Sequence, residues 1–270
     1  MTESTATRLA VVVLAFAMVG SVLVGGAVLA QQSSVGQNQQ TSYVRVVHAS
    51  PDAPPVDVYV DNESTLTNVS FGQVSDYLAV DSGAHNITVT LAGNRSATVI
   101  EENVTLSPRS VSTIAASGEA TANRTELRAE QFTDDAFTPS ANQSAIRVVH
   151  LSPDAPAVDV TVGNGSVVLA DNVSFRNASD YVTVPAGNYT AEIRPATPGD
   201  DGPIVATVNV TLEGGKVYSA MAVGYLNPGE APADVPFQVV ATEDASTTVH
   251  LPPVQAQERN MNQTAAGAGP

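Results

Sequence analysis

The sequence contains no cysteine and no tryptophan, and only one of its 270 residues, Lys216, is a lysine. Without cysteine the chain has no disulfide framework, no thiolate metal site and no cysteine nucleophile. The 27 acidic residues outnumber the 11 basic ones, so the formal net charge is −16. Such a chain repels phosphates and lacks the basic stripe that polyanion binding needs, which excludes nucleic acid as a partner.

The remaining composition is that of a folded protein, with 43% hydrophobic and 14% charged residues. A surface dense in Asp and Glu and nearly free of Lys resembles proteins of extreme halophiles, most often archaea. An ordinary acidic secreted protein is the alternative. Repulsion between surface charges is screened within about 3 Å at 1 M salt, so we expect folding to depend on salt.

The N-terminus carries an export signal. An uncharged apolar run, residues 9–30, follows Arg8. Val28 and Ala30 give the small-residue pattern of a signal-peptidase site, which predicts cleavage after Ala30. No twin arginine is present, which favours the Sec route. An uncleaved anchor remains the alternative, because a run of this length can cross a bilayer. In either case we expect the rest of the chain to be extracellular, secreted or attached to the cell surface.

The strongest signal is an internal duplication. The segment RVVHASPDAPPVDVYVDN at 45–62 recurs as RVVHLSPDAPAVDVTVGN at 147–164, and SDY recurs at 75 and 179. Each unit has about 100 residues, a normal size for one small domain. The predicted boundaries are a signal peptide or membrane anchor at 1–30, a polar linker at 31–42, the first repeat at 43–135, a linker at 136–144, the second repeat at 145–245 and a low-complexity tail at 246–270.

Within each repeat the hydrophobic period is two. Val56, Val58 and Val60 alternate with polar residues, and glycine-containing breaks separate such runs. Residues 125–132 have a helix-forming composition, but their counterpart at 237–244 has a strand pattern, so we predict strands for both. About seven short strands per repeat predict an all-β fold, with two tandem immunoglobulin-like β-sandwich domains after an N-terminal signal or anchor helix.

The repeated pattern VRVVHxSPDAPxVDVxV, followed by SDYxxVxxG and a strand ending in NVTL, resembles the family called domain of unknown function 4397. The resemblance covers roughly residues 43–135 and 145–245. It implies secreted bacterial or archaeal β-sandwich modules, often in tandem, with no established activity. It therefore carries over no catalytic residues. The first repeat departs from the pattern at Asp81-Ser82-Gly83, where the second has Pro185-Ala186-Gly187.

The histidines are the only obvious source of imidazole chemistry. His48 and His150 share strand parity with apolar neighbours, so we expect both to point into a sheet face. A relay of His48, Ser50 and Asp52 is disfavoured, because residues two apart usually cannot share a substrate site. Neither a G-x-S-x-G elbow nor an H-E-x-x-H helix occurs. We predict no catalytic residues and no enzymatic activity.

The SPDAP segments have a structural explanation, since their prolines preset a turn and launch the next strand. Arg45 and Asp57, like Arg147 and Asp159, lie 12 residues apart in both copies. We predict that each pair forms an ion pair across the corner.

A competing hypothesis concerns the tips of the same corners. It has Asp52 and Asp154 present a repeated binding surface instead of supporting the scaffold.

No cofactor is predicted. Calcium is the ion that this oxygen-rich chain would favour, with ligands from Asp57, Asp61 and Glu63, or from Asp200 and Asp201. Neither set has the EF-hand spacing, and neighbouring carboxylates are expected in so acidic a chain. A structural calcium is therefore a minor alternative.

Asparagine usage is more informative, because 13 of the 16 asparagines lie in N-x-S/T sequons. Duplicated turn and strand chemistry explains the sequons matched between the copies and leaves the others unexplained. We therefore predict N-glycosylation. The candidate sites are Asn62, Asn68, Asn86, Asn94, Asn103, Asn123, Asn142, Asn164, Asn172, Asn177, Asn188, Asn209 and Asn262.

These features favour a non-enzymatic surface module with a structural, adhesive or envelope role. An extracellular protein that binds a sugar, peptide or calcium is the alternative, and a hydrolase is the least supported. The expected partner is an unidentified protein or glycan at the cell surface. Contact with the membrane is expected only through the N-terminal segment, if it is uncleaved.

Overall fold

The computed structural model describes residues 41–122, 124–134 and 137–244 and confirms an all-β chain of two β-sandwiches. The first module contains eight strands instead of the expected seven. They are β1 (Thr41–His48), β2 (Val56–Val60), β3 (Glu63–Val69), β4 (Leu78–Asp81), β5 (Gly83–Leu91), β6 (Asn94–Leu106), β7 (Val111–Ser117) and β8 (Arg128–Thr133).

The second module repeats this order. Its strands are β9 (Gln143–His150), β10 (Val158–Val162), β11 (Val167–Val173), β12 (Val182–Pro185), β13 (Gly187–Pro195), β14 (Ala206–Leu212), β15 (Val217–Val223) and β16 (Gln238–Glu243), with one short 3₁₀ helix at Pro228–Glu230. Strands β8 and β16 confirm the strand prediction for 125–132 and 237–244. No helix among the described residues is long and apolar enough to cross a membrane. The predicted signal segment, most of the predicted linker at 31–42 and the whole of the predicted tail lie outside the described residues.

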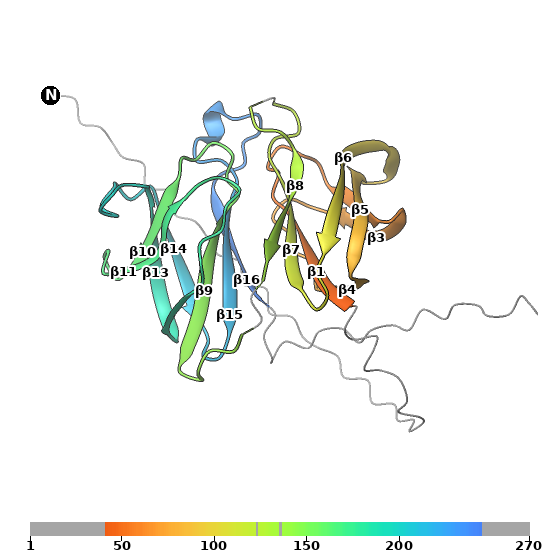
Figure 1. Ribbon diagram of the computed structural model, residues 1–270. Helices are drawn as coiled ribbons and strands as arrows, with labels where there is room; N and C mark the ends of the chain where they lie inside the picture. Colours follow the sequence, from red (N-terminus) through yellow and green to blue (C-terminus); the bar gives the residue numbers. More distant parts are fainter. Residues whose placement is uncertain (1–40, 123, 135–136, 245–270) are drawn as a thin grey trace, which may run out of the picture.

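Each module contains two four-stranded sheets. The inner sheet faces the other module, and the outer sheet faces away from it (Figure 1). The outer sheets have the orders β3-β2-β5-β6 and β11-β10-β13-β14, and the inner sheets β4-β1-β7-β8 and β12-β9-β15-β16. Most neighbouring strands are antiparallel, but β1 runs parallel to β7, and β9 to β15. The matching orders confirm the duplication at the level of topology.

The hydrophobic cores lie between the two sheets of each module. Along β14, buried and exposed residues alternate over the whole strand, as the period of two predicted. The core of the first module includes Val46, Val58 and Ile114, and that of the second includes Val148, Val160 and Val208. The alternation thus places one face of each outer sheet in a core and the other in solvent.

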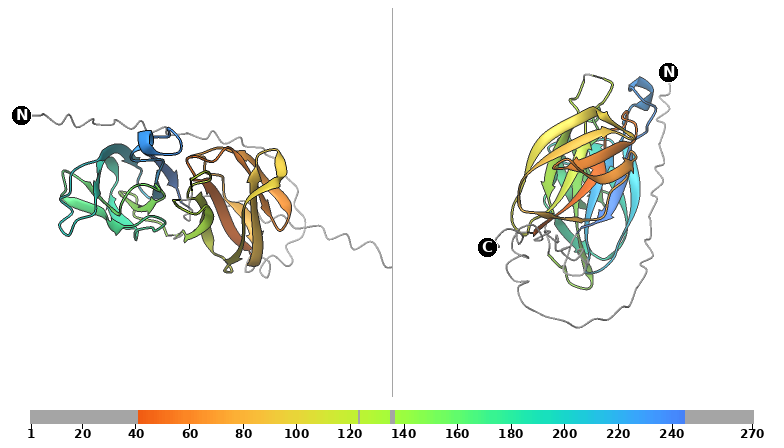
Figure 2. Two further views of the ribbon diagram at one scale, coloured as in Figure 1. Left: turned by 90° about the horizontal axis from the view of Figure 1, so that it is seen from above. Right: turned by 90° about the vertical axis from the view of Figure 1, so that its right-hand side faces the viewer.

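The central strands of the inner sheets do not alternate, because both of their faces are covered. Every residue of β7 is buried, and β1 and β9 each have a single half-buried residue. Figures 1 and 2 show the reason, since the inner sheets of the two modules meet face to face between the outer sheets. An apolar cluster fills the contact. It contains Val47, Ala49, Ala115 and Phe132 from the first module, and Val149, Leu151, Met221 and Val223 from the second.

Candidate functional site

The centre of the contact between the modules holds two buried arginines. Arg45 was expected to pair with Asp57, and this prediction is wrong. The Arg45 guanidinium instead donates to the carboxylate of Asp244, at the end of the other module, and lies 3.7 Å from the carboxylate of Asp134. The correct partner is thus separated from Arg45 by almost the whole folded chain.

Arg147 has the reciprocal arrangement, and its predicted pair with Asp159 does not form either. Its guanidinium donates to Asp134, at the end of β8 in the first module, and its Nε lies 4.0 Å from Asp244. Each module therefore supplies one arginine to the cluster and one aspartate that receives the arginine of the other module.

Tyrosines and hydroxyl groups complete this central charge cluster. The Tyr77 hydroxyl donates to Asp134 over 2.6 Å, and the Tyr181 hydroxyl donates to Asp244 over 2.5 Å. Thr113 also donates to Asp134, and Ser219 donates to Asp244. The tyrosine rings cover the two arginines, with guanidinium carbons 4.9 and 4.8 Å from the ring centroids.

Electrostatics favour the charged form of Arg45 and the neutral form of Tyr77 in the cluster. Burial disfavours the Arg45 cation, but Asp244 and Asp134 outweigh this effect and keep its pKa above the ordinary value. Burial, assisted by the same carboxylates, raises the pKa of Tyr77, so its phenol remains a neutral donor. Two cations and two anions cancel, and every carboxylate is hydrogen-bonded. The cluster can therefore fix the relative position of the modules, but it offers no free acid, base or nucleophile.

A second contact breaks the symmetry between the modules. Arg176, from the loop after β11, donates to the carbonyl and the hydroxyl oxygens of Ser117 over 3.1 Å each and lies 3.3 Å from the Glu130 carboxylate. The matching position of the first module is Gly72, which cannot form these bonds. This contact therefore exists in only one direction across the interface.

The two predicted aspartate partners have a different structural role. The Asp57 carboxylate accepts hydrogen bonds from the backbone N–H groups of Asn68 and Gly93 over 2.8 and 2.9 Å. Asp159 does the same for Asn172 and Thr197, both over 2.8 Å. Each aspartate thus joins a positive-φ residue of the neighbouring strand, in β3 or β11, to the segment that follows β5 or β13. It is therefore part of the scaffold, although its partner was misassigned.

Hydrogen bonds to the aspartate carboxylates hold the SPDAP corners in place. The Asp52 carboxylate accepts the N–H groups of Ala120 and Thr121 over 2.8 and 2.7 Å, and Asp154 accepts those of Leu226 and Asn227 over 2.7 and 2.8 Å. Although partial burial acts the other way, these bonds hold the pKa of Asp52 below its ordinary value. Both carboxylates bind backbone of their own module, which favours the scaffold over the binding-surface hypothesis.

The buried histidines belong to the same corners, as their strand parity predicted. His48 Nε2 lies 3.1 Å from the Pro54 carbonyl, and its Nδ1 accepts the N–H of Ser50 over 3.4 Å. Both ring nitrogens are thus engaged by backbone, and the Ser50 hydroxyl contacts Asp52 instead of the imidazole. His150 has the same contacts in the second module. A relay from His48 to Ser50 therefore does not form.

One group of carboxylates is spaced as cation ligands would be. Oxygens of Asp159, Asp171 and Asp200 all lie within 4.8 Å of one another. Of the residues proposed from sequence as calcium ligands, only Asp200 belongs to this group. The fold brings the other two, Asp159 and Asp171, from β10 and β11. Burial, followed by repulsion from Asp159 and Asp171, raises the pKa of Asp200. Asp61 of the other proposed set accepts from His85 and from the N–H of Asn86 instead.

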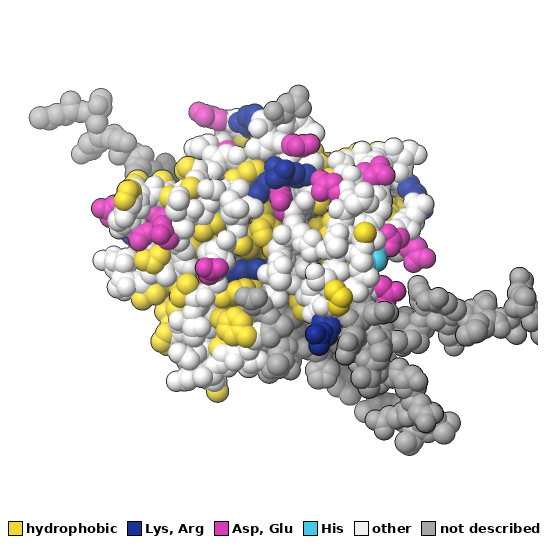
Figure 3. Space-filling model, viewed as in Figure 1, with side chains coloured by type: hydrophobic (Ala, Val, Ile, Leu, Met, Phe, Trp, Pro, Cys, Tyr) yellow, Lys and Arg dark blue, Asp and Glu magenta, His cyan; other side chains and the backbone are white. Residues whose placement is uncertain are grey.

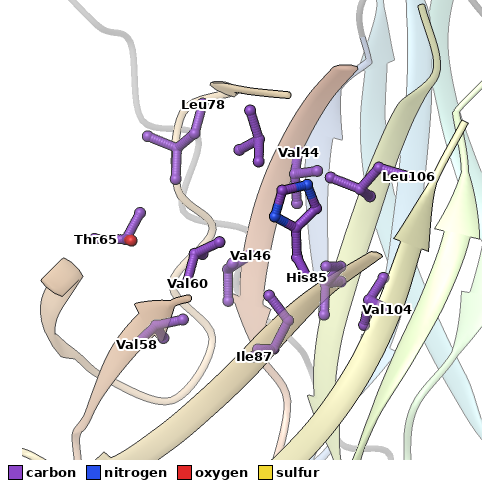
Figure 4. A pocket seen from close by; sticks show the side chains of 12 residues that line it. Val44, Val46, Val58, Val60, Thr65, Leu78, His85, Ile87, Val104 and Leu106 are labelled. Atoms are coloured by element: carbon purple, nitrogen blue, oxygen red, sulfur yellow. The ribbon is translucent and has the colours of Figure 1, made fainter. Parts of the chain in front are cut away.

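The enclosed cavities are too small for a ligand. A cavity of about 20 Å³ lies between the sheets of the first module, lined by Thr65, His85 and apolar side chains (Figure 4). A matching cavity of about 30 Å³ lies in the second module. Each has about the volume of one water probe, and apolar walls of this kind stay dry. His85 bonds the Asp81 carbonyl and Tyr189 bonds the Pro185 carbonyl, so both side chains hold the matching turn of their module.

A larger hollow lies at the surface of the first module. It has a volume of about 440 Å³ and is lined by Val99, Glu119, Ala120, Ala122, Thr125, Glu126 and Leu127. Arg124 already pairs with the Glu119 carboxylate over 3.0 Å. The lining thus offers few unpaired polar groups for recognition.

The candidate glycosylation sites are accessible. Eleven of the sequon asparagines are described, and all are exposed except Asn86, which is half-buried. Nine lie on the outer sheets or their turns, and none lies on an inner sheet. Asn62, Asn68, Asn164 and Asn172 have positive φ, a conformation that asparagine tolerates better than most residues. These four matched positions therefore also have a backbone reason to be asparagine. Asn123 and Asn262 lie outside the described residues.

The exposed charge is mostly negative. On the face drawn in Figure 3, acidic side chains are scattered over both modules among uncharged and hydrophobic surface, and the few basic side chains form no continuous stripe. Since the central charge cluster is neutral, the net charge of −16 resides on the other residues.

Comparisons with known proteins agree with the repeat. The family model described as "Domain of unknown function (DUF4397)" matches residues 42–161 and 152–259. No curated protein sequence matches the chain. Among solved structures, the chain is similar to the Bacillus anthracis TIE protein, with 12% identity, a TM-score of 0.22 and coverage of 69% of this chain and 34% of that one. It is also similar to a leucine-rich repeat protein from Bacteroides thetaiotaomicron, with 16% identity, a TM-score of 0.20 and coverage of 69% and 26%. The chain thus spans about a third or less of these two proteins.

Proposed function

The chain belongs to the family described as domain of unknown function (DUF4397), in two copies, and from this premise we propose that it is a non-enzymatic building block of the cell surface. Its role is structural, adhesive or envelope-associated, and its partner is a protein or glycan of that surface. The central charge cluster carries the proposal, because it joins the modules into one body of fixed geometry.

The chemistry of the other conspicuous residues supports this role. The histidines and aspartates of both SPDAP corners bind backbone, so they are not free for acid-base or nucleophilic work. The cavities between the sheets have no room for a substrate. A spacer or adhesive module needs neither free catalytic side chains nor a substrate cavity, since it acts through its surface.

The location and the surface chemistry are part of the proposal. The apolar N-terminal run and the site after Ala30 support export by the Sec route, with the segment either cleaved or retained as an anchor. The exposed sequons support N-glycosylation of the outer sheets. The acidic, lysine-poor surface supports a source that lives in high salt, as halophilic archaea do.

Cell fractionation combined with N-terminal sequencing tests the location. We expect the protein in the medium or the envelope, with a mature N-terminus at Gln31 if the signal is cleaved. A full-length chain in the cytoplasm would exclude a surface role. Turnover of a generic hydrolase substrate, lost in His48→Ala, would show that the protein is an enzyme.

A ligand-binding role is the second candidate, and the grouping of Asp159, Asp171 and Asp200 favours calcium over a sugar or a peptide. Thermal unfolding with and without calcium separates the two candidates. A rise in melting temperature that is lost in Asp171→Asn would support the second. An unchanged melting temperature would contradict the calcium-binding role and favour the surface module.

A further inference from the structure

Strand β14 is an open sheet edge. It is the last strand of the outer sheet of the second module, and among the described residues it pairs with β13 alone. Its register with β13 is unbroken over seven residue pairs. Its sequence, ATVNVTL, contains no charge and no proline. Edge strands are normally blunted by charge, proline, bulges, short length or a covering segment. Within the part of the chain that the structure describes, none of these features protects β14.

The equivalent strand of the first module shows what a closed edge looks like. β6 carries Glu101 and Glu102, and its pairing with β5 is interrupted by register shifts. β8 also lies against it, with the Ala129 N–H donating to Glu102 and the Gln131 amide donating to the Thr105 carbonyl. Among residues 41–122, 124–134 and 137–244, no corresponding hydrogen bond joins β14 to β16.

The remaining edges are protected as well. β4 and β12 have four residues each, β3 and β11 pair through register shifts, β8 carries Arg128 and Glu130, and β16 ends in Glu243, whose carbonyl accepts from Arg45. β14 is thus the one strand among the described residues that keeps an unprotected, uncharged edge of full length.

The chemistry of this edge fits a second copy of itself. In an antiparallel pair centred on Asn209, Thr207 lies opposite Thr211 of the second copy, and Val208 lies opposite Val210 of the second copy. The flanking Glu213 falls opposite Val205 of the second copy, so no two acids face each other. Like charges directly opposite destabilise a sheet, and a chain of net charge −16 offers few edges where a second copy avoids them.

We propose that β14 is a self-association edge, at which a second copy of this chain adds antiparallel and converts two four-stranded outer sheets into one of eight strands. The pair is closed by a two-fold axis, so it ends at a dimer. Asn209 lies at the axis and is also a sequon, so a sugar there would hinder the approach of the second copy. Only this sugar effect rests on the proposed glycosylation.

A cysteine cross-link tests the geometry directly, because the natural chain has no cysteine. Opposed residues of an antiparallel pair have Cβ atoms about 4.5–5.5 Å apart, close to the range in which a disulfide forms. Full-length unglycosylated Asn209→Cys, oxidised at about 2 M salt to screen repulsion, should give a covalent dimer. The matched variant Asn103→Cys, at the equivalent position of the closed strand β6, should remain a monomer. Equal cross-linking of the two variants, or none in either, would overturn the proposal.

Sedimentation of the unmodified chain supplies the second measurement. Unglycosylated wild type should form a dimer that dissociates on dilution, and Asn209→Lys, which adds a charge to the edge, should lose it. Asn103→Lys should keep it. A wild type that stays monomeric, or a dimer that survives Asn209→Lys, would contradict the proposal.

Glycosylated protein separates the sugar effect from the edge itself. Chains with Asn209 occupied, as shown by mass spectrometry, should be monomeric. If the sugar is absent from every chain, the glycosylation proposal fails at this residue, while the two tests on unglycosylated protein still decide the edge.

Discussion

Arg45, in the first strand of the first module, is ion-paired with Asp244, which directly follows the last strand of the second module. The pair is buried, with 2% and 0% of the two side chains exposed. Arg147 and Asp134 mirror it across the interface. Buried charges of this kind are weak evidence for added stability, but removing one partner leaves the other unpaired in a low-dielectric site. Their strongest effect is therefore on which surfaces are held together.

Replacing Asp244 should destabilise the first module, although Asp244 belongs to the second. We expect Asp244→Ala to lower the free energy of unfolding by about 3–5 kcal/mol, because Arg45 is left without its closest carboxylate. Chemical denaturation measures the effect. The control is Asp180→Ala, an exposed position where we expect less than about 1 kcal/mol. A loss below about 1 kcal/mol for Asp244→Ala would show that the pair is not buried in solution.

The two modules should unfold as one unit. Each contributes an arginine whose closest carboxylate lies in the other, so the unfolding of either module breaks the closest ion pair of its neighbour and uncovers the apolar inner face of that neighbour. Differential scanning calorimetry should give a single transition for the wild type and a single, lower one for Arg147→Ala. Two resolved transitions in the wild type would mean that the interface contributes little.

Acid should weaken the fold through the buried histidines. Burial, opposed by backbone hydrogen bonds, lowers the pKa of His48 and His150 below the ordinary value of 6.5. Below pH 6.5 the unfolded chain takes up protons that the folded chain does not, so this contribution is complete above that pH and declines as the pH falls. Titration of the imidazole resonances by NMR measures both values. An ordinary pKa for His48 would contradict the neutral, backbone-bonded ring.

Salt should stabilise the protein. Below 0.1 M salt the screening length exceeds about 10 Å, so repulsion among the surface acids extends across a module. We expect the melting temperature to rise between about 0.05 M and 2 M salt. A melting temperature that stays constant over this range of salt concentration would contradict the halophilic interpretation.

Asp200→Asn should raise the melting temperature when a chelator is present. The pKa of Asp200 is raised by burial, then by Asp159 and Asp171, which means that its ionised form is disfavoured in the folded chain. The neutral amide removes that repulsion. Asp201→Asn, at the neighbouring exposed residue, is the control. A lower melting temperature in Asp200→Asn would indicate that its carboxylate has a favourable partner.

The architecture could be predicted from sequence because its signals are local. Strand periodicity and the repeated SPDAP segment are visible within a few residues, and they correctly predict two all-β modules. The paired sequons also have a local origin in part. A strand such as β14 alternates exposed Asn and Thr with buried Val, so solvent-facing chemistry by itself produces the pattern N-x-T.

The central charge cluster escaped prediction because its members lie far apart in sequence. Arg45 has an aspartate 12 residues away in the matching place of both copies, which made Asp57 the natural partner. Two signals pointed elsewhere. In RVVH the residues on both sides of the strand are apolar, which is typical of a strand covered on both faces. The SDY tyrosine and an aspartate after the last strand recur in both copies, at Tyr77 and Asp134 in the first.

The reciprocal pairing also has a consequence for the order in which the modules fold as the chain is synthesised. Arg45 and Asp244 are separated by 199 positions. A chain that leaves a membrane channel N-terminus first, as proposed for this protein, presents Arg45 long before its partner emerges. Until then Arg45 lacks its closest carboxylate, and the inner sheet of the first module has an uncovered apolar face. If the chain is exported in this way, the first module completes its buried ion pairs only after Asp244 has left the channel.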